Sequence, residues 1–195
     1  MIACLIMLAA ASTAAQSSAT QIAQATFQPE RAIADALAQW DAQFDAGVTR
    51  ASVGRTMTAD QEARKNRAKA AGKAELSQQL RTTGIPKMLH LIEADYIQNF
   101  SEEELREAAI FWTSPAGQAF TAAMQEAVKN GTGRIVPPAQ HAAAINRYMT
   151  SATGRKESVR SGILRPVLAK EMGLFMQQAQ PKIDARMRAA MSAAS

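Results

Sequence analysis

The sequence has a single cysteine among its 195 residues, Cys4, which lies in an apolar stretch at the N-terminus. If that stretch is removed, the remaining chain has no thiol, which excludes a disulfide framework, a cysteine nucleophile and a cysteine-ligated zinc site. Histidine is almost as scarce, and His90 and His141 have no partners at a convincing metal-ligand spacing. We therefore expect neither a metal nor any other cofactor.

Aromatic residues are also sparse, at 5%, and runs of β-branched residues are nearly absent. Hydrophobic residues nevertheless make up 47% of the chain, which is enough for a core and argues against wholesale disorder. Alanine, methionine, glutamine, arginine and lysine recur throughout, and all of them favour helices. No apolar run reaches the roughly 20 residues that a membrane-spanning helix needs, so we expect a mature chain that does not span a membrane.

The apolar stretch Ile2–Ala11 has the length of the hydrophobic region of a signal peptide. Small residues follow it and predict cleavage after Ala15, with a second candidate site after Ala25. No lysine or arginine precedes the stretch, which departs from the usual pattern. Lipid attachment at Cys4 and a buried N-terminal core helix are the alternatives. We expect a periplasmic or secreted protein with a signal peptide at 1–15, possibly to 25, and a single helical domain over 29–195.

Apolar residues recur at helical spacing along the rest of the chain, and no segment alternates as a strand. We expect an all-α bundle of six to eight helices without an internal repeat. Thr83–Pro86 is predicted to form a turn. Pro166 is expected to kink or split a helix whose buried face includes Val159, Ile163 and Val167. The predicted helices cover residues 29–46, 58–80, 86–100, 101–112, 115–128, 139–150, 158–179 and 181–191.

Two short motifs near the middle of the chain are more specific than this helical pattern. Phe100–Leu105 contains the Ser-x-x-Glu of a capping box, and Phe111–Gly117 ends in Ser-Pro-Ala-Gly, where the serine suits a second helix cap. Together they resemble the core motif of domain of unknown function 2059 (DUF2059), bacterial exported or periplasmic helical proteins. The resemblance covers about residues 85–130. It is carried by Phe100, Ser101, Glu103, Glu104, Leu105, Phe111, Trp112, Ser114, Pro115 and Gly117. It implies export and a helical fold, and it brings no catalytic residue.

Charge is unevenly distributed along the chain, whose formal net charge is +5. An acidic stretch at 30–49 is followed by a basic stretch at 50–73. The basic candidates for contact with an anionic partner are Arg64, Lys65, Arg67, Lys69 and Lys73. They are equally suited to pairing with the acidic stretch. No stacking aromatic residues are interleaved with them, so we expect no nucleic acid partner.

These patterns favour a non-enzymatic interaction module of the bacterial envelope. Its partner is unknown, with an envelope protein or an anionic envelope component as candidates. The glutamates at 102–104 suit a helix N-terminus, and capping accounts for Ser114, so neither needs a catalytic role. One alternative is a carrier or chaperone-like protein that binds an apolar ligand or client. A second alternative is a hydrolase with an unrecognised site.

Overall fold

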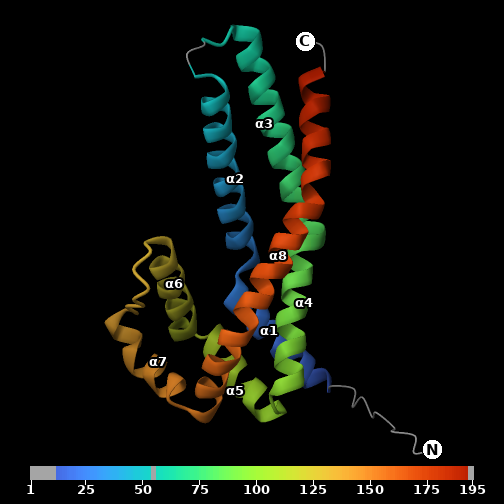
Figure 1. Ribbon diagram of the computed structural model, residues 1–195. Helices are drawn as coiled ribbons and strands as arrows, with labels where there is room; N and C mark the ends of the chain where they lie inside the picture. Colours follow the sequence, from blue (N-terminus) through green and yellow to red (C-terminus); the bar gives the residue numbers. More distant parts are fainter. Residues whose placement is uncertain (1–11, 54–55, 193–195) are drawn as a thin grey trace, which may run out of the picture. The chain divides into compact units, whose positions relative to one another are not determined.

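A computed structural model describes residues 12–53 and 56–192 (Figure 1). Within these residues the chain forms eight α-helices, a π turn, a 3-10 turn and no strand, which confirms the predicted all-α fold. The α-helices are α1 (Thr13–Phe27), α2 (Pro29–Ala51), α3 (Ala59–Gln79), α4 (Ile85–Asn99), α5 (Glu102–Thr113), α6 (Pro115–Lys129), α7 (Ala142–Met149) and α8 (Ala152–Ser192). The π turn is Leu80–Gly84 and the 3-10 turn is Ala139–His141.

The helices divide into two compact units whose boundaries fall inside α4 and α8. Unit 1 contains the chain up to Thr26 and Leu89–Leu164. Unit 2 contains Phe27–Met88 and the chain from Arg165 onward. Both α4 and α8 therefore contribute residues to both units. The single domain expected over 29–195 stays a prediction.

In unit 2, α2, α3 and the C-terminal part of α8 lie side by side (Figure 1). Leu76 of α3 and Ile183 of α8 are fully buried, and Phe175 of α8 is buried against Gly84 of the π turn. Gly72 on α3 permits the close packing, because a Cβ there would lie 2.7 Å from Trp40 Cζ2 and 2.9 Å from Met187 Cγ. Unit 2 is thus a three-helix arrangement with its own core.

Unit 1 has a separate core, to which α1, α5, α6 and α7 contribute. Ile22 of α1 and Leu105 of α5 are almost completely buried, and large aromatic side chains fill the space around them. Aromatic residues bury large apolar areas, so this core relies on the few that the sequence has.

Helix α1 includes residues that the sequence analysis assigned to the leader region. Ala19 and Ile22 are fully buried in the unit 1 core. Cleavage after Ala15 would retain both side chains, whereas cleavage after Ala25 would remove them. The apolar stretch over residues 1–11 lies outside the described residues, and export stays a prediction.

The turn expected at residues 83–86 and the break expected between residues 179 and 181 are continuous helix in the structure, so those predictions were wrong. At Pro166 the helix is not split, and the kink stays a prediction. At Thr83–Pro86 the π turn, in which the Ile85 N–H bonds to the Leu80 carbonyl, leads directly into α4, so the backbone stays helical up to Pro86. Helix α8 runs through Pro166 and Pro181 without a break. An internal proline costs about 3 kcal/mol, and burial of α8 residues on both sides of Pro166 offsets that cost.

The buried face of α8 also differs from the predicted one. Val159, Ile163 and Val167 are 67%, 51% and 42% exposed. The helix begins at Ala152, earlier than expected, and buries Thr153 and Glu157 instead. Apolar spacing failed here because polar side chains make the buried contacts of this part of α8.

Candidate functional site

The family-like motif of the sequence forms the corner between α5 and α6. The Ser101 hydroxyl accepts a hydrogen bond from the Glu104 N–H, and the Glu104 carboxylate accepts one from the Ser101 N–H at 2.7 Å. At the other end of α5, Ser114 Oγ accepts from the Gly117 N–H at 3.1 Å, and Pro115 begins α6. The predicted caps of both helices are therefore confirmed.

Glycine is required at position 117 by the closeness of the two helices. A Cβ there would lie 2.8 Å from Trp112 Cα and closer still to the carbonyl oxygen of Phe111. Both of those atoms belong to the backbone, which cannot rotate away as a side chain can. Phe100, Leu105 and Trp112 are buried around the corner, whereas Glu103 is exposed.

A second corner with the same construction joins α7 to α8. We name Phe111–Gly117 the first corner and Tyr148–Gly154 the second. Ser151 Oγ accepts from the Gly154 N–H at 3.1 Å, as Ser114 does from Gly117. A Cβ on Gly154 would lie 3.0 Å from Met149 Cα and closer to the Tyr148 carbonyl oxygen.

The two corners share a sequence pattern, an aromatic residue followed by x-Thr-Ser-x-x-Gly. The threonines behave alike too, since Thr113 donates to the Ala109 carbonyl at 2.7 Å and Thr150 to the Asn146 carbonyl at 2.8 Å. The expectation of no internal repeat was therefore wrong at this local level. Searching for the spaced aromatic, Thr-Ser and Gly would have found it.

The aromatic residues that open the two corners lie against each other. The rings of Phe111 and Tyr148 stack with centroids 3.9 Å apart and planes 10° apart. Trp112 meets the edge of Tyr148, with centroids 6.1 Å apart. The corners are thus joined through one aromatic cluster.

Glu157, on the first turns of α8, places a carboxylate in this cluster. Its oxygens accept hydrogen bonds from the hydroxyls of Tyr96 at 2.6 Å and Tyr148 at 2.5 Å, and from Trp112 Nε1 at 3.0 and 3.1 Å. The side chain is 6% exposed. Three donors from α4, α5 and α7 therefore converge on one buried carboxylate of α8.

Burial raises the pKa of Glu157, and its three hydrogen bonds oppose that shift without cancelling it. Burial and the neighbouring carboxylate also raise the pKa values of Tyr96 and Tyr148. A strongly perturbed carboxyl can mark an active site. Here all three donors are protein groups already bound to it, so the arrangement holds four helices together.

Polar contacts on either side of Glu157 continue this attachment of α8. Lys156 Nζ lies 2.7 Å from Glu104 Oε2 and 4.8 Å from the centroid of the Phe100 ring. The hydrogen bond from Lys156 lowers the pKa of Glu104. Arg160 pairs with Asp95 one turn further along α8.

In unit 2, the lysines of the predicted anion-contact set pair with carboxylates of the same unit. Lys69 Nζ lies 2.7 Å from Asp45 Oδ2, and Lys73 Nζ lies 2.5 Å from Asp41 Oδ2. The hydrogen bond to Asp45 raises the pKa of Lys69. Lys65 pairs with Glu62.

The two arginines of the set differ from these lysines. Arg67 Nε donates to the Ala190 carbonyl oxygen at 3.4 Å. Arg64 makes no ion pair or hydrogen bond through its side chain with any residue that the structure describes. Of the five predicted cations, Arg64 is therefore the one most available to an outside anion.

A groove of about 560 Å³ lies beside Arg64, where the ends of α2 and α8 meet the start of α3. Its lining is mostly apolar and includes Phe44, Val48, Met57, Met187 and Met191, with Arg64 and Lys65 as its charged members. A groove of this size and character is typical of small-molecule and peptide sites. Methionines in such grooves adapt to differently shaped apolar partners.

Two further features of the described residues concern metal ions and membranes. In the described part of the chain, no three histidine, cysteine or acidic side chains are grouped so that they could hold a metal ion. Among the helices that the structure describes, none has the length and apolar character needed to cross a bilayer.

Comparison with known proteins gives a family for the central region. No curated protein and no solved structure matches the chain. Residues 86–144 match the model of a family described as uncharacterized protein conserved in bacteria, DUF2059. The match includes Tyr96, Trp112 and the first corner, and it ends before the second corner and Glu157. The resemblance inferred from the two motifs is confirmed by the match over residues 86–144.

Proposed function

We propose that this protein is a non-enzymatic binding protein of the bacterial envelope, and that it binds the apolar part of its partner in the groove of unit 2. The observation that carries the proposal is the groove itself, whose floor combines Phe44, Val48 and three methionines. Burial of apolar surface contributes about 25 cal/mol per Å², so an occupant would gain affinity from this lining.

The carboxylate cluster of unit 1 supports a binding function over the hydrolase alternative. A general acid or base must reach a substrate proton within hydrogen-bond distance. Glu157 is 6% exposed and already accepts bonds from Tyr96, Trp112 and Tyr148. The envelope assignment rests on the predicted signal peptide and the bacterial family match.

The groove is tested by titration with the neutral fluorescent probe N-phenyl-1-naphthylamine. Met191→Gln is expected to weaken probe binding about fivefold, since part of one methionine contact is worth about 1 kcal/mol. Leu174→Gln is the matched control. Both residues are on α8 and similarly exposed, at 41% and 38%, but only Met191 lines the groove. Equal effects of the two substitutions, or no probe binding, would contradict the proposal.

The envelope assignment is tested by the denatured mass of protein expressed from its full sequence and recovered from the periplasm. Cleavage after Ala15 is the expected result, because it retains the buried Ala19 and Ile22. A full-length mass, or retention in the cytoplasm, would overturn the assignment.

A further inference from the structure

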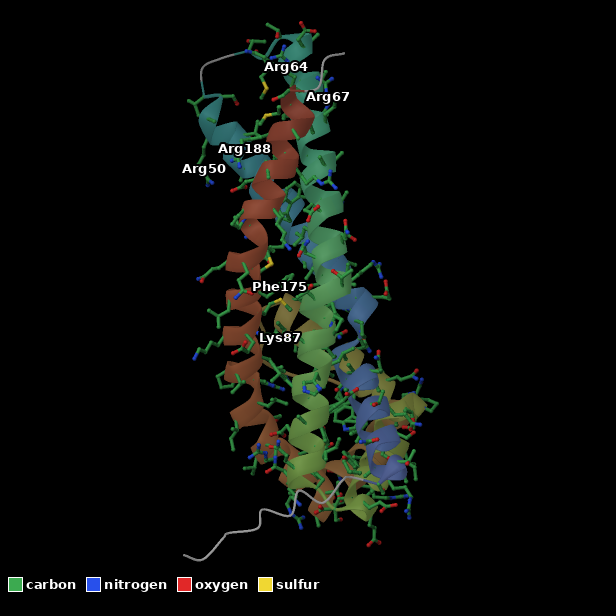
Figure 2. All side chains as sticks on the ribbon, turned by 90° about the vertical axis from the view of Figure 1, so that its right-hand side faces the viewer. Arg50, Arg64, Arg67, Lys87, Phe175 and Arg188 are labelled. Carbon is green, nitrogen blue, oxygen red and sulfur yellow. The ribbon has the colours of Figure 1, made fainter. Side chains whose placement is uncertain are left out.

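Arginine side chains gather at the end of unit 2 that holds the groove. Figure 2 shows Arg50 from α2, Arg64 and Arg67 from α3, and Arg188 from α8 in this region. In the described part of the chain, Arg50, Arg64 and Arg188 form no side-chain ion pair or hydrogen bond. Unpaired guanidinium groups therefore come from all three helices at this end of unit 2, and among them Arg64 lines the groove.

Several cations farther along unit 2 are paired. Arg81 binds Glu30 through two bonds of 2.7 and 2.8 Å, and Lys87 lies 2.6 Å from Glu171. Two carboxylates next in sequence to groove residues are already paired, since Glu62 is held by Lys65 and Asp45 by Lys69. Asp184, which lines a separate pocket with Arg188, accepts a hydrogen bond from Gln180. Asp60, in the first turn of α3, is the remaining acidic neighbour on that helix. The groove end of unit 2 thus keeps an excess of positive charge.

We infer that the groove takes an acidic amphiphile, an aliphatic chain that ends in a carboxylate or a phosphate. The chain lies against Met57, Met187 and Met191, and the head group binds the Arg64 guanidinium. This inference rests on the proposed function and adds the chemical class of the ligand. Guanidinium suits both head groups because its fork of N–H donors matches two oxygens of either one.

The dimensions of the groove fit a single chain. Its lining on α2 runs from Phe44 to Ala51, which corresponds to about 10 Å of helix. Its volume of about 560 Å³ is within the range of small-ligand sites. Arg64 and the apolar residues line the same groove, so one molecule can contact both.

The test compares decanoate, decyl phosphate and decyl maltoside, which share one chain and differ in head-group charge. Affinities are measured by displacement of N-phenyl-1-naphthylamine. Both acids are expected to bind about tenfold more tightly than the neutral maltoside, because a charge-assisted bond is worth roughly that factor. Arg64→Gln should remove this preference, so that the two acids bind no more tightly than the maltoside. Arg67→Gln, which does not line the groove, should retain it.

Several results would overturn the inference. Equal affinities of the three ligands for the wild-type protein would show that the groove does not distinguish head groups by their charge. An unchanged acid preference in Arg64→Gln would remove the residue assigned to the head group. If the neutral probe and maltoside bind but neither acid does, the inferred ligand class is wrong, whereas the proposed binding of apolar groups in the groove is still supported. If nothing binds, the proposed function fails as well.

A vesicle experiment separates free amphiphiles from a membrane surface. Vesicles of phosphatidylglycerol are sedimented with wild type and with Met191→Gln. If the groove binds single amphiphile molecules, Met191→Gln should weaken decanoate binding. Sedimentation that is equal for both proteins, with no binding of decanoate by either, would indicate adsorption to an anionic surface and contradict the inference.

Discussion

The two corners of unit 1 have the same backbone turn, but one places an apolar side chain against Trp112 and the other places a polar one there. The third residue after Gly117 is Phe120, whose ring stacks on the indole with centroids 6.1 Å apart. The third residue after Gly154 is Glu157, whose carboxylate accepts a bond from the same indole at 3.0 Å. Trp112 therefore receives an apolar contact from one corner and a polar contact from the other.

This difference shows that the corner fixes the path of the backbone but not the kind of side chain that enters the core. The serine, the glycine and the neighbouring carbonyl set the backbone, so the direction of the next helix is determined locally. The residue carried into the core can then vary, provided that its polar groups are satisfied. Glu157 meets this condition because Tyr96, Trp112 and Tyr148 all donate to it.

The largest expected effect comes from adding a methyl group at either corner. Gly117→Ala and Gly154→Ala should each lower the free energy of unfolding by about 4 kcal/mol, because the new Cβ would overlap backbone atoms. Urea unfolding followed by circular dichroism measures the change. Gly162→Ala is the control, since nothing lies within 4 Å of its Cβ position on α8. That variant should gain up to about 1 kcal/mol. A much smaller loss of unfolding free energy at only one of the two corners would show that the corners are not equivalent.

The next largest effect compares substitutions of Glu157 and Phe120, the residues that the two corners place against Trp112. Glu157→Leu removes the acceptor of three donors, two of them buried, and should cost about 3 kcal/mol. Phe120→Leu keeps an apolar side chain against Trp112 and should cost about 1 kcal/mol. The same unfolding experiment compares them. Equal losses would mean that the hydrogen bonds to Glu157 add nothing beyond packing.

Glu157 should also give unit 1 an unusual dependence on pH. Because its pKa is raised, the folded protein holds this proton to a higher pH than the unfolded chain does. Its contribution to stability is therefore complete below the ordinary value of 4.5 and is lost as the pH rises toward the folded pKa. Glu157→Gln does not titrate at this position. The unfolding free energy of the wild type relative to the variant should therefore fall as the pH rises from 4.5 toward the folded pKa of Glu157. A difference that is constant with pH would contradict the assignment.

The smallest effect tests whether the second corner accepts the proline of the first. Ala152 corresponds to Pro115, and its N–H makes no hydrogen bond with the residues that the structure describes. Ala152→Pro should therefore change the free energy of unfolding by no more than about 0.5 kcal/mol, and a gain is expected. A loss above 2 kcal/mol would show that the backbones of the two corners differ.

The first corner was predictable because its residues have strong local preferences. Ser114 caps α6 and Pro115 begins it whatever surrounds them, as Ser101 and Glu104 cap the start of α5, so both patterns can be read from sequence. The second corner keeps the threonine, serine and glycine but has Ala152 where the first has proline. Without that proline, the start of α8 was not recognised, and the predicted helix began only at residue 158 instead of Ala152.

The remaining differences arise from tertiary contacts that override local preference. Apolar spacing selected Val159 and Ile163 for the core, whereas α8 is attached through Glu157 and its three donors. Pro166 was expected to kink or split a helix, and α8 runs through it without a split. The groove was not predictable in position, because Met57, Met187 and Met191 come from distant parts of the sequence.

The most direct test of the proposed function uses methionine methyl groups as reporters. Protein labelled with ¹³C at these methyls is titrated with decyl maltoside and decanoate, and each resonance is assigned by substitution. The proposal predicts shifts of Met57, Met187 and Met191, which line the groove, and no change at Met124 and Met149, which pack against the unit 1 core. Shifts confined to Met124 and Met149, or no shift with either ligand, would contradict it.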